Sequence, residues 1–121
     1  GLADECGSGA AVGTKLNLPL QPGASDAEFR EVWQIAEEFL REQAPHFILC
    51  QCGVDSLAGD PLAHLSLSPS SHAYATQRLC RLANELCQGR LMVFGGGGYN
   101  LHNVAHGWSV VLEELLRGSW R

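Results

Sequence analysis

Two short loops of this sequence carry side chains that can do chemistry. Asp60 lies in a Gly-Asp-Pro turn after the apolar run 47–52, and Tyr99 follows four glycines after the apolar run 91–94. If each run is a parallel strand that leads into a helix, both side chains lie at the carboxyl ends of neighbouring strands, where open α/β sheets bind ligands. We therefore expect a carboxylate and a phenol to share one crevice.

The glycine run 95–98 removes every side chain from the second loop, which lets a ligand approach the backbone and lets φ take positive values. Glycine loops between a strand and a helix often bind phosphate. Residues 95–100 lack the GxGxxG spacing, and no Walker-type lysine and hydroxyl pair follows them. The sequence therefore disfavours nucleotide binding.

Strand and helix signals alternate around these loops. Residues 16–18 are expected to form a short strand, and the capping-box spacing of Ser25 and Glu28 predicts that a helix begins there. Pro45 disfavours helical geometry in the residue before it, so this helix ends ahead of it. The continuous apolar run 47–52 is typical of a strand covered on both faces.

The second half of the chain continues the alternation. We expect a helix over about 71–87 with Gly89 as its stop, a strand at 91–94, and a last helix that Asn100 caps and Gly118 ends. By the right-handed crossover rule, this order predicts a layered α/β fold whose three strands, 16–18, 47–52 and 91–94, are parallel. Asp60 and Tyr99 would then open on the same side of the sheet.

Composition bounds the function. The chain has 121 residues and is 45% hydrophobic, which fits one globular domain. Its net charge is -5 and it has no basic stripe, so no feature of the sequence would bind nucleic acid phosphates. A cationic partner suits this charge better. No apolar stretch approaches the length that spans a bilayer, so no membrane partner is expected.

Five cysteines, an odd number without a CxxC pair, indicate neither a disulfide framework nor a zinc knuckle. Free cysteines usually behave as small buried hydrophobes. We therefore expect a reducing, intracellular location, in the cytoplasm or the nucleus.

Several separate motifs together resemble the zinc-dependent histone deacetylase family, including the acetoin-utilisation deacetylases of bacteria. They are NLPLQPGASDAEF at 17–29, QCGVDSLAGDPLAHLSLS at 51–68, GGGGYN at 95–100, and the 39 residues from Asp60 to Tyr99. The resemblance covers nearly the whole chain but only the C-terminal part of the family's domain. It implies that residues 1–121 form a partial arginase/deacetylase-like α/β fold with a parallel sheet.

The resemblance also implies a site and a reaction. Asp60 would be one of three protein ligands of a catalytic zinc, and Tyr99 would donate its hydroxyl to the oxyanion formed when water attacks an acetyl amide. Gly97 and Gly98 would keep the wall of the acetyl-lysine tunnel thin, and Leu67 would line it. From local sequence alone, Asp60 also suits a structural turn, Tyr99 a half-buried aromatic, and Leu67 plain core packing.

Some motifs of the histone deacetylase family are missing from this sequence. No DxHxG-like motif and no adjacent His-His pair occurs, so two zinc ligands and the acid-base histidines would belong to a missing N-terminal part of the domain. We expect the chain alone to be inactive, and its partners to be that missing part and an acetylated lysine or small acetylated amine. The rivals are a non-catalytic binding module and an acetylpolyamine or other small-amide deacetylase.

Three other polar side chains are not expected to bind a metal. Asp55 is expected to make loop hydrogen bonds rather than to contact metal. His102 and His106 are four residues apart on a helix and could grip a metal, but no glutamate stands between them as in HExxH, and an exposed pair is the commoner case.

Overall fold

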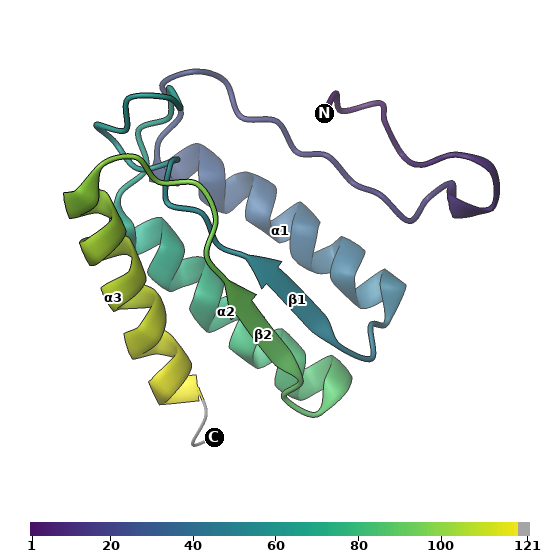
Figure 1. The fold of residues 1–121 in the computed structure, drawn as a ribbon. Helices are drawn as coiled ribbons and strands as arrows, with labels where there is room; N and C mark the ends of the chain where they lie inside the picture. The colour runs from purple at the N-terminus through teal and green to yellow at the C-terminus, as the bar shows by residue number, and fades with distance from the viewer. Residues whose placement is uncertain (119–121) are drawn as a thin grey trace.

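A computed structural model describes residues 1–118 and shows an N-terminal arm followed by alternating helices and strands (Figure 1). Strands β1 and β2 lie side by side across α1 and α2, α3 lies next to α2, and the arm extends on the opposite side from α3. The elements are η1 (Gly9–Ala11), α1 (Asp26–Gln43), β1 (Ile48–Gln51), α2 (Pro69–Cys87), β2 (Leu91–Phe94) and α3 (Leu101–Gly118).

The two strands pair in parallel, with Ile48 opposite Leu91 and Gln51 opposite Phe94. A parallel pair needs a long crossover, and the segment with α2 supplies it. This confirms the predicted α/β fold with a parallel sheet and places the carboxyl ends of β1 and β2 at one edge.

The predicted strand at Leu16 to Leu18 is wrong, because the described part of the chain forms a sheet of two strands only. A strand exists only where another strand completes its ladder. Here Lys15 bonds to Glu5 at 2.6 Å and the Asn17 amide bonds to the Leu2 carbonyl at 2.8 Å, which ties the segment back onto the N-terminal arm.

The helix ends follow local chemistry. Glu28 accepts hydrogen bonds from the Ser25 backbone at 2.9 Å and from its hydroxyl at 2.6 Å, which confirms the predicted capping box of α1. Helix α2 begins two residues before the predicted Ser71, because Pro69 suits the first helical position and Ser68 caps it. The Asn100 side chain accepts from the His102 backbone at 3.0 Å and so caps α3 as predicted.

Two apolar clusters form the core. The first joins β1 to α2 through Ile48, Leu79, Leu82, Ala83 and Cys87. The second, formed by Val54, Leu57 and Leu67, lies under the long loop between β1 and α2, and Val104 and Trp108 of α3 pack against it. The loop that carries Asp60 is therefore anchored from below by its own apolar side chains.

The second cluster also fixes the backbone of the glycine loop. Gly98 has a φ of 144°, and a Cβ atom there would lie 2.6 Å from Cγ2 of Val54 and 3.2 Å from Cγ2 of Val104. Gly95, in the same loop, has no such restriction, since a Cβ there would make only an ordinary contact with Trp108 at 3.8 Å.

The other face of the sheet is uncovered. Leu49 is 67% exposed, and Met92 and Phe94 are 48% and 45% exposed. All five cysteines are free thiols, and no helix among residues 1–118 is long and apolar enough to cross a membrane.

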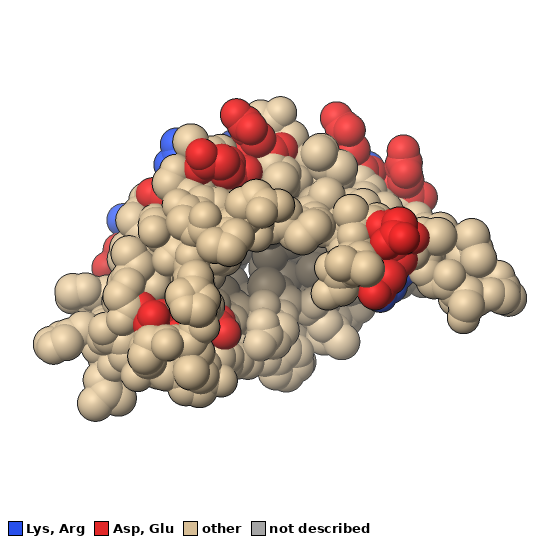
Figure 2. Space-filling view, turned by 90° about the horizontal axis from the view of Figure 1, so that it is seen from above, with Lys and Arg blue, Asp and Glu red and all other residues tan. Residues whose placement is uncertain are grey.

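Acidic side chains are conspicuous over α1, where Glu28, Glu31, Glu38 and Glu42 are exposed. Figure 2, the view from above, shows more acidic than basic atoms on this face and a hollow in its middle. The surface thus reflects the net charge of -5.

A buried ion pair joins α1 to α2. Glu37 is 4% exposed, and its two carboxylate oxygens accept from Nε and Nη2 of Arg78, both at 2.5 Å. This bidentate pair holds the pKa of Glu37 below its usual value. Removing Arg78 would leave the buried Glu37 carboxylate with only the longer ion pair to Arg41, at 3.5 Å.

A second carboxylate, that of Asp26, ties the start of α1 to the start of α2. It accepts hydrogen bonds from the Ser68 backbone at 2.8 Å, from the Ser68 and Ser71 hydroxyls at 2.5 Å each, and from the Ser70 hydroxyl at 3.0 Å. Burial alone would raise the pKa of Asp26, but these donors outweigh it and lower the pKa to about 2. The residues that follow the Asp60 loop are thereby held against α1.

We predict that Asp26→Asn reduces the unfolding free energy at pH 7 by about 1–2 kcal/mol, after allowance for partial solvent exposure. The folded-state pKa of Asp26, about 2, lies below the usual value of an aspartate, so the stabilisation is complete above about pH 5 and is lost as the pH falls toward 2. Urea unfolding across this range should show the two proteins converging at low pH. The exposed Asp4→Asn is the matched control, and a constant difference at all pH values would contradict the prediction.

We also predict that Gly98→Ala lowers the unfolding free energy by about 2–4 kcal/mol, because it combines backbone strain with overpacking. Gly95→Ala, in the same loop, should change it by no more than about 0.5 kcal/mol. Denaturant unfolding of both variants checks this, and equal effects would show that the loop tolerates a side chain at either position.

Candidate active site

The Asp60 loop and the glycine loop meet through a direct hydrogen bond. The Tyr99 backbone N–H donates to Oδ2 of Asp60 at 2.9 Å, although the two residues are 39 positions apart. Each loop follows the carboxyl end of a strand in a parallel pair. The expectation that Asp60 and Tyr99 lie on the same side of the sheet is therefore confirmed.

The Asp60 carboxylate is held entirely by backbone donors. Its other oxygen, Oδ1, accepts from the Leu62 N–H at 2.8 Å and the Ala63 N–H at 3.2 Å, and the residue is 9% exposed. Burial alone would raise the pKa of Asp60, but the three backbone donors outweigh it and hold that pKa below its usual value. The group is thus a fixed anion at neutral pH.

Two asparagines, the cap of α3 and one in its first turn, hold the turn before Asp60. The Asn100 amide donates to the Gly59 carbonyl at 3.2 Å, and the Asn103 amide donates to the Ala58 carbonyl at 3.1 Å. The sequence indicated Asn100 only as a helix cap and gave no role to Asn103. These contacts span 41 and 45 residues, so no local pattern reveals them.

The glycine loop packs closely against the backbone that follows β1. The Gly97 carbonyl accepts from the Val54 N–H at 2.7 Å, and the Asp55 carboxylate occupies the space that a Cβ at Gly97 would need. Within residues 1–118 the Asp55 side chain has no hydrogen bond, so its predicted loop bonding is replaced by this contact.

The remaining predicted site residues divide into exposed and buried ones. Tyr99 is 57% exposed, so its phenol ring projects from the loop toward solvent. Leu67 is 3% exposed and forms a parallel bridge with Leu57 inside the second core cluster. In this chain Leu67 therefore packs in the core, which is the structural alternative that the sequence left open.

Metal-ligating groups are sparse near these loops. Across the described residues 1–118, no three or more His, Cys, Asp or Glu side chains are grouped so that they could hold a metal ion. His102 and His106 are both exposed on α3, in agreement with the commoner interpretation of such a pair.

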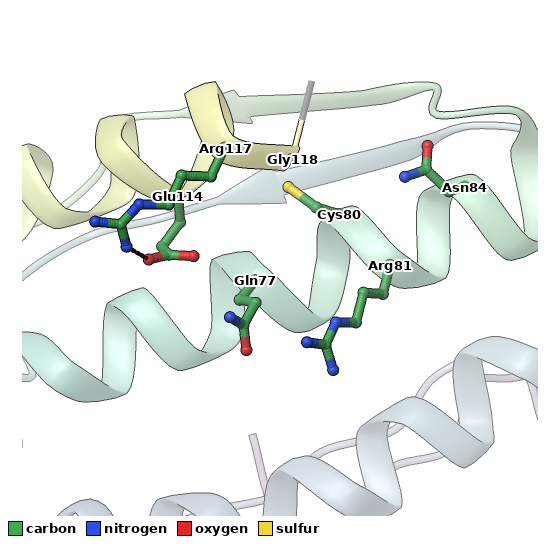
Figure 3. A pocket seen from close by; sticks show the side chains of 7 residues that line it. All are labelled: Gln77, Cys80, Arg81, Asn84, Glu114, Arg117 and Gly118. Atoms are coloured by element: carbon green, nitrogen blue, oxygen red, sulfur yellow. Dashed lines mark hydrogen bonds and ion pairs between the residues drawn. The ribbon is translucent and has the colours of Figure 1, made fainter. Parts of the chain in front are cut away.

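A cavity of about 300 Å³ lies elsewhere, between α2 and the last turn of α3 (Figure 3). Arg117 is ion-paired to Glu114 there at 2.5 Å. The other lining residues are Gln77, Cys80, Arg81, Asn84 and Gly118. Neither Asp60 nor Tyr99 lines it, so the cavity is separate from the candidate site.

Comparisons with known proteins place the chain in a family. The model of the histone deacetylase domain family matches residues 1–115. Histone deacetylase 14, chloroplastic, of Arabidopsis thaliana is 36% identical over 117 residues, which are 96% of this chain and 28% of that protein. Histone deacetylase RPD3 of Saccharomyces cerevisiae is 34% identical over 121 residues, covering 93% of this chain and 27% of that protein.

A solved relative shows the same arrangement. The crystal structure of the HDA15 HD domain superposes with a TM-score of 0.85 at 29% identity and covers 96% of this chain and 33% of that one. The chain thus spans about a third or less of the relatives it matches. On the family match and these similarities, the chain belongs to the histone deacetylase domain family.

Proposed function

We propose that this chain is the C-terminal portion of a zinc-dependent deacetylase domain that hydrolyses an acetyl amide on a lysine side chain or a related amine. One observation carries the proposal: the hydrogen bond from the Tyr99 N–H to the Asp60 carboxylate, which brings the two candidate residues to one point. Membership of the histone deacetylase family supports the reaction class.

The Asp60 carboxylate suits a role as zinc ligand. Its pKa is lowered, so it is anionic at neutral pH, and carboxylate oxygen is an accepted ligand of zinc. Oδ2 takes a single N–H donor, which leaves lone-pair capacity for a metal. A bound zinc ion would polarise the amide carbonyl and acidify a water molecule.

One carboxylate does not make a zinc site, so the proposal requires a partner. The other ligands and the general base would come from a part of the domain that this chain does not contain. The uncovered sheet face, with Leu49, Met92 and Phe94 exposed, is the surface on which we propose that this part packs.

Tyr99 is proposed to donate its hydroxyl to the oxyanion that develops on the acetyl carbonyl. A neutral donor fixed in advance stabilises that charge without reorganisation during the step. Its backbone is fixed at Asp60 while its ring is exposed, so the ring can face a substrate. Gly97 and Gly98 beside it let the loop lie close against Asp55 and Val54, which would keep this wall of the acetyl-lysine tunnel thin. Leu67 would support that wall from the core.

Two other functions use the same fold. A non-catalytic binding module would keep Asp60 as a structural turn residue and Tyr99 as a surface aromatic. A deacetylase of acetylpolyamines or other small amides would keep the chemistry and differ in substrate. The net charge of -5 suits a cationic substrate in either enzyme and does not separate lysine from polyamine.

We predict that Tyr99→Phe, in a complete protein carrying this chain, lowers kcat by about 10²–10³-fold, because the hydroxyl stabilises the transition state. KM should change far less, since uniform binding is not removed. Asp60→Ala should instead reduce the zinc content. Steady-state kinetics and metal analysis of both variants separate the two roles, and a normal kcat for Tyr99→Phe would show that this tyrosine is structural.

We further predict that the purified 121-residue chain binds zinc weakly and has no amidase activity. A single carboxylate cannot hold the ion against water, and the absent ligands supply most of the affinity. Zinc titration and an acetyl-lysine peptide assay test this. Turnover by the chain alone, abolished by a chelator, would show that it contains a complete site.

A further inference from the structure

One buried histidine has no part in the proposed chemistry but contacts the backbone between β1 and the Asp60 turn. His72, in the first turn of α2, is 8% exposed, and its Nε2 lies 2.9 Å from the Gly53 carbonyl oxygen. A carbonyl only accepts, so Nε2 carries the proton. Nδ1 is buried without a hydrogen-bond partner among residues 1–118. The ring therefore makes its hydrogen bond through Nε2 alone.

The peptide unit whose carbonyl His72 contacts makes a second hydrogen bond through its N–H. The same peptide bond, between Gly53 and Val54, donates its N–H to the Gly97 carbonyl at 2.7 Å. A trans peptide directs its C=O and its N–H to opposite sides. The Gly53–Val54 peptide therefore links His72 of α2 on one side to the glycine loop on the other. The loop also lies against Gly53, where an added Cβ would come within 2.8 Å of the Gly97 nitrogen.

The glycine loop depends on such backbone contacts, because residues 95–98 have no side chains to anchor it. Two hydrogen bonds hold it after β2: Val54 N–H to the Gly97 carbonyl, and Tyr99 N–H to Asp60. The orientation of the Gly53–Val54 peptide sets the first of them. A group that fixes this peptide therefore helps to fix the residue two positions before Tyr99.

We propose that His72 is a positioning residue for Tyr99. Its Nε2–H holds the Gly53 carbonyl, this orients the Val54 N–H toward Gly97, and the glycine loop in turn presents the Tyr99 ring. The inference rests on the proposed function for its kinetic consequence, but the mechanical link to the loop stands on the hydrogen bonds alone.

Three substitutions in a complete protein carrying this chain separate positioning from space filling. His72→Phe keeps an aromatic ring and removes the donor, His72→Gln offers an amide N–H at the reach of Nε2, and His72→Asn has too short a reach. We expect His72→Phe and His72→Asn to lower kcat roughly 10- to 100-fold through misplacement of Tyr99, with KM within about 3-fold of the parent. His72→Gln should recover most of the lost kcat.

A double-mutant cycle with Tyr99→Phe tests whether His72 acts through that tyrosine. If it does, His72→Phe should lower kcat little further once the Tyr99 hydroxyl is absent. Effects that simply multiply would overturn the proposal. So would a His72→Gln enzyme as slow as His72→Asn, a comparison that stands even if the Phe variant fails to fold.

Amide hydrogen exchange supplies a readout that does not depend on activity. Peptides covering residues 53–60 and 95–100 should exchange faster in His72→Asn than in the parent, and His72→Gln should restore their protection. Unchanged exchange in His72→Asn would refute the mechanical link. An inactive parent whose loop still loosens in His72→Asn would instead refute the proposed function and leave the link supported.

Discussion

The candidate site depends on one carboxylate that holds two loops together. Asp60 accepts backbone hydrogen bonds from its own turn, at Leu62 and Ala63, and from Tyr99 across 39 residues. Each loop follows a different strand, and the parallel pairing of those strands brings their ends to one edge of the sheet. The negative charge of Asp60 is therefore structural even before any metal is considered, because it organises the backbone that carries the tyrosine.

Several layers of contact support that carboxylate. The cluster of Val54, Leu57 and Leu67 fills the space beneath the Asp60 loop. Asn100 and Asn103 hold the turn from the side of α3. The end of the same loop is fixed where the Ser68 backbone and hydroxyl bond to Asp26. A long loop with no regular structure of its own is usually functional, and here it is held from three sides.

The sequence predicts those parts of the structure that short-range chemistry determines. The capping box at Ser25 and Glu28 and the Asn100 cap depend on neighbours within a few residues, and both are confirmed. The strand 91–94 is confirmed as well, although its partner β1 lies far from it in the sequence. The strand at 16–18 fails because pairing depends on a partner that local pattern does not contain. Asp26 and His72 were overlooked for the same reason: their partners lie 42 and 19 residues away.

Strand order predicts that Asp60 and Tyr99 lie close together, but it does not predict which of their atoms make the contact. The sequence indicates two side chains that share a crevice, whereas the observed contact joins the Asp60 carboxylate to the Tyr99 backbone. This leaves the phenol ring free of Asp60 and exposed. The arrangement lets one residue anchor the other without occupying its hydroxyl group, which is what an oxyanion donor needs.

The most direct test is a crystal structure of a complete protein carrying this chain, with zinc and an acetyl-lysine substrate bound, in which anomalous scattering locates the metal. We expect an Asp60 oxygen at about 2.0–2.2 Å from the zinc. The Tyr99 hydroxyl should lie about 2.7–3.1 Å from the oxygen of the acetyl carbonyl. Zinc bound away from Asp60, or a substrate carbonyl out of reach of Tyr99, would contradict the account.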